Sequence, residues 1–421
     1  MKTFAITTAL ATTIALSATA ATAQYSKPAA PATPAPTAQS QAPAGKDAQP
    51  QIKISKEASK AIIDLQKSVN ANDAANIPAK VAAAQAVAKT PEDRYAIGQM
   101  QLKAALAAKN DESAAAAIDY IAGSAFLPGA RVAELYNAVG INFYNAKNYD
   151  RAAALFDKGV AADASGFESL KLLAEARNSQ GRSAEAAQAM QKALTLAANS
   201  GQKPTEDVYK RAVSLAYGAK SPLAVDLGRQ WVNAYPGPDS WHNAVAIYRN
   251  MMRPEVESTL DLLRLMRAAN ALQGTGDYTL FATAAAEQGN FNEAQSVIDE
   301  GLANKKIDAS SPLARDIVNG LKSKPKASAA ELEAAAKSAK TATALMAVGN
   351  RFYGTGNYAR AADLYRSALG AGGDTNLANL HLGMALARTG DKAAAAAALG
   401  AVTGPYAGVA KYWLLFVQKA G

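Results

Sequence analysis

VGINFYNAKNYDRAAALF at 139–156 and VGNRFYGTGNYARAADLY at 348–365 are two versions of one string of residues. Ten residues (Val, Gly, Phe, Tyr, Asn, Tyr, Arg, Ala, Ala and Leu) recur in them at identical offsets. Chance does not produce so particular a string twice in one chain. We therefore expect one structural unit to be used repeatedly along this sequence.

The distance between neighbouring copies is 34 residues. Residues of matching type at this separation are Ala152 and Ala186, Phe156 and Met190, Gly349 and Gly383, Gly356 and Gly390, and Ala361 and Ala395. A 34-residue period with these residue types resembles the tetratricopeptide repeat, a helix–turn–helix unit. The resemblance implies a first helix with a small residue on its inner face and a second helix that carries a small residue and a large one.

The resemblance is strong over 133–200 and 342–409, with two copies in each region. It is weaker over 52–130 and 201–341, where helical patterns continue without a clear repeat register, and residues 410–421 are predicted to form a capping helix. Helix start signals recur along the chain, such as Thr90-Pro91-Glu92-Asp93 and Ser328-Ala329-Ala330-Glu331. We predict an all-α fold, a right-handed superhelix (α-solenoid) of stacked helical hairpins.

Glycines are predicted to mark the places where the two helices of a hairpin meet closely. Gly140, Gly349 and Gly383 occupy equivalent positions, at which a Cβ atom would hold the helix axes apart. Ala152, Ala361 and Ala395 are expected to face these glycines from the second helix, while the aromatic residues fill the gap to the next hairpin.

The N-terminal residues predict export. Met1-Lys2 is a short positive start, residues 4–20 carry no charge, and Ala21-Thr22-Ala23 has the small residues that signal peptidase requires. We expect a signal peptide over 1–23, cleaved near Ala23; the alternative is an N-terminal membrane anchor. Residues 24–50 include six prolines and are predicted to be a disordered Pro/Ala/Gln-rich linker, either a spacer or a passive connection. The mature protein is expected to be periplasmic or secreted.

Catalytic and cofactor motifs are absent from the sequence. It has no cysteine, its two histidines, His242 and His381, lie far apart, and no phosphate loop or nucleophile elbow is present. We expect His381 to face solvent. The net charge of +9 is spread among acidic residues without a basic stripe, which argues against nucleic acid as a partner. We predict that the chain is not an enzyme and takes no cofactor or metal.

The family resemblance implies that a partner peptide lies along the first helices of successive repeats. The positions expected to face this groove include Asn137, Tyr144, Lys171, Glu175, Asn178, Met346, Asn350, Tyr353, Met384 and Arg388. One subgroup of the family grips a C-terminal carboxylate with Lys and Asn at two of these positions. No copy here has both, since Lys171 is followed by Glu175 and Asn350 is preceded by Met346.

Three functions are compatible with this sequence. The first is a scaffold of the cell envelope that binds a partner protein or peptide of unknown identity. The second is a structural protein whose copies self-associate at an envelope or secreted surface. The third is a helical enzyme acting on polysaccharides, which would require an acid or base cluster in a cleft, and the sequence displays none.

Overall fold

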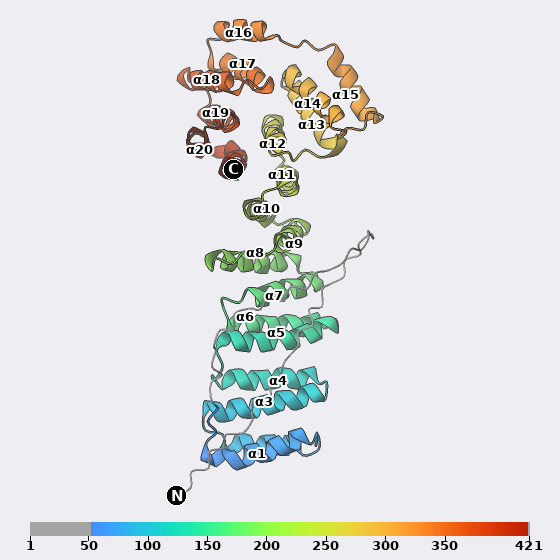
Figure 1. The fold of residues 1–421 in the computed structure, drawn as a ribbon, viewed down its shortest axis with the longest axis vertical. Helices are drawn as coiled ribbons and strands as arrows, with labels where there is room; N and C mark the ends of the chain where they lie inside the picture. The colour runs from blue at the N-terminus through green and yellow to red at the C-terminus, as the bar shows by residue number, and fades with distance from the viewer. Residues whose placement is uncertain (1–51, 420–421) are drawn as a thin grey trace, which may run out of the picture. The chain divides into compact units, whose positions relative to one another are not determined.

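The computed structural model describes residues 52–419, which form 21 α-helices and a short 3-10 helix, with no strand in that range (Figure 1). The helices are α1 (Lys56–Asn70), α2 (Ile77–Val87), α3 (Pro91–Ala107), α4 (Asp111–Gly123), α5 (Gly129–Asn145), α6 (Tyr149–Ala162), α7 (Phe167–Ser179), α8 (Ser183–Asn199), α9 (Glu206–Gly218), α10 (Leu223–Ala234), α11 (Pro238–Met252), α12 (Val256–Ala268), α13 (Gly274–Glu287), α14 (Phe291–Ala303), α15 (Pro312–Lys322), α16 (Ala329–Ser338), α17 (Ala342–Gly354), α18 (Tyr358–Gly370), α19 (Thr375–Thr389), α20 (Lys392–Gly400) and α21 (Ala407–Lys419), with η1 (Gly404–Tyr406). The predicted all-α solenoid architecture is confirmed; the handedness of the superhelix stays a prediction.

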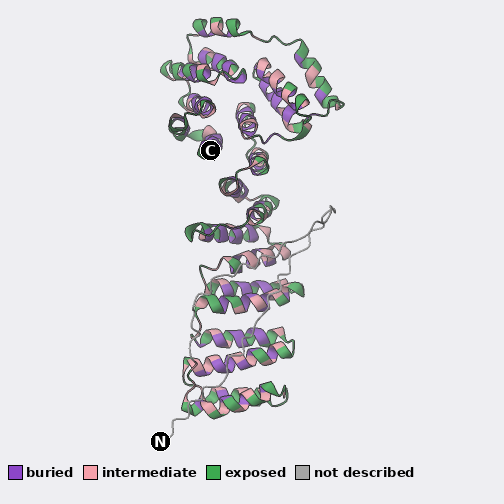
Figure 2. Cartoon of the chain, viewed as in Figure 1, coloured by how far each residue is buried: buried purple, intermediate pink, exposed green. Residues whose placement is uncertain are grey.

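The chain divides into two compact units, Met1–Ser169 and Leu170–Gly421, which are described separately. The predicted signal peptide and linker lie outside the described residues. In the first unit, consecutive helices pack as hairpins: α1 with α2, α3 with α4 and α5 with α6. Contacts of α1 with α3 and of α4 with α5 join neighbouring hairpins, so that the buried faces form a continuous core (Figure 2).

In the second unit, consecutive helices also pack on one another, but contacts between distant helices are added. Helix α21 contacts α10 and α12 as well as α19 and α20, and α14 contacts α17. The last helices of the chain therefore pack against helices that precede them by more than a hundred residues. Tyr412 and Trp413 of α21 are fully buried at this junction.

Helix starts follow the predicted chemistry. Thr90 and Asp93 form the reciprocal capping box of α3, and Ser328 and Glu331 form that of α16. These side chains satisfy backbone N–H groups that would otherwise have no partner in the first turn.

The close approach predicted at the repeat glycines is confirmed. A Cβ atom on Gly140 would lie 2.5 Å from Cε1 of Phe156, and one on Gly349 would lie 2.6 Å from Cε1 of Tyr365. The space beside Gly383 is filled in the same way by the side chain of Leu399. The nearest partner is thus a large side chain of the second helix, rather than the alanine that precedes it by one turn.

Candidate functional site

The two copies of the repeated string are built from the same local contacts. Asn148 caps α6 by accepting a hydrogen bond from the Arg151 N–H, and Asn357 caps α18 through the N–H of Arg360. Both arginines pair with a glutamate of an earlier helix, Arg151 with Glu112 of α4 and Arg360 with Glu333 of α16. Because each second helix is fixed in this way, α5 and α17 are held in equivalent positions within their hairpins.

In the first copy, the predicted groove residues are only partly available. Asn137 is buried, and its Nδ2 donates to Oγ of Ser169 at 2.9 Å. Tyr144 is half-buried and its ring packs edge-on against Tyr149, with centroids 5.3 Å apart. Asn137 is therefore an internal residue that bridges two helices, and only Tyr144 reaches the surface.

Helix α7 carries three of the predicted groove residues, all half-buried. Glu175 accepts two hydrogen bonds from the guanidinium of Arg211, at 2.8 and 2.7 Å, and Asn178 accepts one from Ser183. Lys171 lies one turn earlier on the same helix. The polar groups of Glu175 and Asn178 thus already have partners within the chain.

In the C-terminal copies, two of the predicted groove residues are inside the protein. Tyr353 is 5% exposed and Met384 is fully buried. Met346 and Asn350 are half-buried, and Asn350 accepts a hydrogen bond from the Tyr365 hydroxyl at 2.7 Å. A peptide cannot touch Tyr353 or Met384 in this structure, so the expectation that these two side chains line an open surface is wrong.

The remaining residue of the predicted set, Arg388, is half-buried near the C-terminal end of α19. Its guanidinium lies 4.8 Å from the centroid of the Tyr358 ring. This contact between α19 and the start of α18 is a cation–π interaction within the repeat pair.

Helix α12 explains the burial of the C-terminal repeats, because it occupies the space that the predicted groove would leave open. Arg264 of α12 lies 4.8 Å from the centroid of the Tyr353 ring, and His381 Nε2 lies 3.0 Å from Asp261 Oδ2. Trp413 Nε1 donates to the Asp261 carbonyl at 3.1 Å. Figure 1 shows α12 lying between α13–α14 and the last helices of the chain. The first-helix face of the C-terminal repeats thus binds a helix of the same chain.

A fully buried cluster of charged side chains joins these helices. Arg264 donates to both Glu293 oxygens, at 2.9 and 2.6 Å, and to Asp261 at 3.1 Å; Asp261 also faces His381. None of these four side chains is more than 3% exposed. The prediction that His381 faces solvent is therefore wrong: its helix is covered on that side by α12.

The cluster is held together by its own charges. Burial opposes ionisation of Asp261, but His381 and Arg264 outweigh burial and hold the pKa of Asp261 below its ordinary value. Burial likewise disfavours the charged form of Arg264, while Glu293 and Asp261 raise its pKa well above the ordinary value. The cluster joins α12 to α14 through Arg264 and Glu293, and to α19 through Asp261 and His381.

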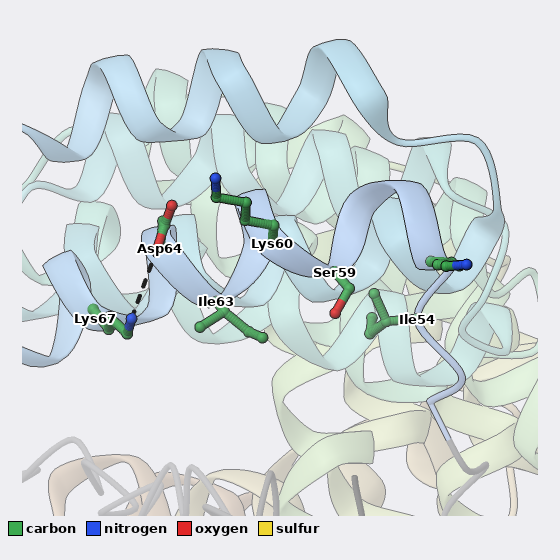
Figure 3. A pocket seen from close by; sticks show the side chains of 7 residues that line it. Ile54, Ser59, Lys60, Ile63, Asp64 and Lys67 are labelled. Carbon is green, nitrogen blue, oxygen red and sulfur yellow. Dashed lines mark ion pairs between the residues drawn. The ribbon is translucent and has the colours of Figure 1, made fainter. Parts of the chain in front are cut away.

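The described surface includes two open hollows. The first, of about 610 Å³, lies along α1 and is drawn in Figure 3. Its lining residues are Ile54, Lys56, Ser59, Lys60, Ile63, Asp64 and Lys67. It combines two isoleucines with three lysines and a single carboxylate.

The second hollow, of about 520 Å³, lies within the second unit, on α8, α10 and α21. It is lined by Gln191, Asp226, Arg229, Gln230, Asn233, Lys411, Leu414, Leu415 and Gln418. Side-chain amides dominate its rim, and these groups both donate and accept hydrogen bonds.

Metal sites and membrane-spanning helices are not found among residues 52–419. No group of three or more His, Asp or Glu side chains in that range could hold a metal ion. Within the same residues, no helix is both long enough and apolar enough to span a bilayer.

Residues 139–202 and 346–408 match the family model of the tetratricopeptide repeat. These two regions are tetratricopeptide repeats. They contain both copies of the repeated string and the glycine contacts described above.

Several solved structures are similar to this chain, and two of them are described as tetratricopeptide repeat proteins. YrrB, described as having an unusual peptide-binding site, is 14% identical with a TM-score of 0.31 and covers 44% of this chain and 92% of its own. A tetratricopeptide repeat protein from Parabacteroides merdae ATCC 43184 is 10% identical with a TM-score of 0.28, covering 70% of this chain and 99% of its own. The apo form of RapI is 13% identical with a TM-score of 0.27, covering 75% and 97%. No curated protein matches the chain significantly.

The sequence carried a signal for the buried cluster that the repeat pattern concealed. Residues 260–266, LDLLRLM, place Asp261 and Arg264 in an otherwise apolar run. A helix that is apolar on every side is buried on every side. Charges in such a run must find buried partners, and these partners lie far away in the sequence at Glu293 and His381.

Proposed function

We propose that this chain is a non-catalytic scaffold that is exported and binds a partner protein. The observation that carries the proposal is the pair of tetratricopeptide regions set in an all-helical array over residues 52–419. Stacked helical repeats present extended surfaces with many side chains in fixed positions, which suits protein recognition.

Export rests on the N-terminal sequence. The charge-free stretch at 4–20 followed by Ala21-Thr22-Ala23 has the order of features of a cleavable signal. The absence of cysteine from the whole sequence is compatible with an oxidising compartment.

The partner surface is proposed to lie outside the groove of the C-terminal repeats. That groove holds α12, whose side chains Asp261 and Arg264 are buried against it. The hollows on α1 and on α8, α10 and α21 are open, and both mix apolar and polar groups. An interface with a small apolar centre and a polar rim is typical of protein recognition.

The absence of native cysteine makes a direct test possible. A single Ile63→Cys or Asn233→Cys substitution places one photo-reactive label in the first or the second hollow, and Lys192→Cys on exposed α8 surface is the matched control. Mature protein would be irradiated in envelope extract and the cross-linked products identified by mass spectrometry.

We expect one protein to be cross-linked from a hollow and not from Lys192→Cys. Equal labelling from all three positions, or none from either hollow, would contradict the scaffold proposal. Cross-links to the chain itself would instead support self-association. Fractionation of cells that express the full sequence tests export, with retention of the uncleaved chain in the cytoplasm as the contrary result.

A further inference from the structure

Two isoleucines, Ile63 of α1 and Ile54 just before the helix, form a short apolar stripe that is partly exposed among residues 52–419. One side of α1, with Ile62 and Leu65, is buried against α2 and α3. On another side, Ile63 is 38% exposed, and Ile54 is half-buried against the edge of the same core. Figure 3 shows Ile54, Ser59 and Ile63 along one side of the helix.

The position of α1 in the helical array determines which of its faces a neighbouring helix covers. Helix α1 is the first helix of residues 52–419, and within that range no hairpin precedes it. Terminal repeats of solenoids need a polar outer face to remain soluble. Ile54 and Ile63 depart from that requirement, which indicates a surface that another chain covers.

The charged residues that line the hollow indicate the charge that a partner of this surface would carry. Lys56, Lys60 and Lys67 line the hollow together with one carboxylate, Asp64, which lies 3.8 Å from Lys67. Lys56 and Lys60 are exposed and stand one helical turn apart. The lining of the hollow therefore has an excess of positive charge, and exposed Glu57 of α1 lies outside that lining.

We infer that α1 docks an acidic amphipathic helix of a partner protein, an inference that rests on the proposed scaffold function. Apolar side chains of that helix would cover Ile54 and Ile63, and its carboxylates would pair with Lys56 and Lys60. The partner helix would continue the stacking of helix on helix that the rest of the array uses. Its negative charge speeds and orients the encounter.

Two other occupants fit the same surface less well. The chain's own segment 24–50 carries Lys27 and Lys46 against a single acid, Asp47, so its net charge has the same sign as that of the α1 face. An anionic lipid surface would favour a flat face with aromatic residues at its border, whereas this face is hollowed and no aromatic residue lines it.

The test measures binding of a designed probe to the mature full-length protein. The probe is a fluorescent synthetic helix with leucines on one face and glutamates on the other, and fluorescence anisotropy reports its affinity. A second probe with glutamine in place of every glutamate separates charge from apolar contact. Vesicles of phosphatidylglycerol test the lipid alternative.

Three variants locate the binding. Lys60→Glu reverses one charge in the hollow, Ile63→Ser removes the exposed apolar side chain, and Lys192→Glu makes the same charge change on the exposed surface of α8, in the second unit. Circular dichroism confirms that each variant is folded. We expect Lys60→Glu and Ile63→Ser each to weaken binding of the acidic probe roughly tenfold, and Lys192→Glu to change it less than about twofold.

Failure of this inference differs from failure of the scaffold proposal. If the acidic probe does not bind, binds as well as the glutamine probe, or is weakened equally by Lys192→Glu, the inference is overturned. Binding to vesicles without binding to the probe also overturns it. A partner cross-linked only from Asn233→Cys in the second hollow would leave the scaffold proposal in place.

Discussion

The copies of the repeated string at 139–156 and 348–365 have the same internal contacts and different surroundings. In both, a tyrosine of the first helix packs edge-on against the tyrosine that begins the second: Tyr144 with Tyr149 at 5.3 Å, and Tyr353 with Tyr358 at 4.9 Å. Yet Tyr144 is half-buried, whereas Tyr353 is buried beneath the guanidinium of Arg264. The hairpin is the same, and only the element that covers it differs.

This difference shows that a repeat motif specifies its own hairpin and leaves the use of its outer face open. In the C-terminal copy that face binds α12 within the same chain through a buried charge cluster. Repeat register alone therefore predicts how the helices are oriented. Whether the resulting groove is open to a partner depends on helices elsewhere in the sequence.

The largest expected effect is on the cluster that holds α12. Arg264→Ala leaves Glu293 buried without its cation and removes one of the two partners of Asp261, so we expect a loss of about 3–5 kcal/mol in the free energy of unfolding. The control is Arg267→Ala, whose half-exposed pair with Glu300 is worth about 0–1 kcal/mol. Urea unfolding followed by circular dichroism measures both, and similar losses would mean that the cluster does not hold α12.

A second comparison concerns the two equivalent tyrosines. Removing the ring of buried Tyr353 in Tyr353→Ala should cost about 3–5 kcal/mol. Tyr144→Ala removes a half-buried ring and should cost about 1 kcal/mol. Thermal unfolding of the two variants measures the difference, and equal losses would show that α12 does not cover Tyr353 in solution.

The glycine contact should behave alike in both copies. Gly140→Ala and Gly349→Ala each force a Cβ atom against an aromatic ring, for an expected loss of about 1–3 kcal/mol. Gly370→Ala is the control, since a Cβ atom there has open space and alanine favours the helix. If unfolding curves show that Gly370→Ala loses as much stability as the other two variants, the close-packing explanation is refuted.

The smallest effect is expected at the caps of the second helices. Asn148→Ala and Asn357→Ala each remove one side-chain cap and should each cost about 1 kcal/mol. Because both caps are part of the hairpin itself, the two losses should agree. A markedly larger loss in one copy, measured by the same unfolding experiment, would show that its surroundings reach the cap.

Much of the hairpin architecture could be predicted from particular residues. The equivalence of Gly140 and Gly349 located the close helix contacts, and Thr90 with Asp93 and Ser328 with Glu331 located two helix starts. These features depend on residues that are close in sequence, where spacing determines which atoms can meet. The site was predicted less well: Asn137, Tyr353 and Met384 have the helix positions that the resemblance implies, but all three are buried.

The sequence by itself determined the repeat period, the hairpins and the glycines at which their helices meet, because these follow from contacts within about one repeat. Only the tertiary structure decided which repeat faces remain open. The pairing of His381 with Asp261 joins residues 120 positions apart, and the hydrogen bond from Tyr412 to the Ala244 carbonyl joins residues 168 apart. No local pattern encodes such contacts, since they depend on how the turns between many successive helices add together.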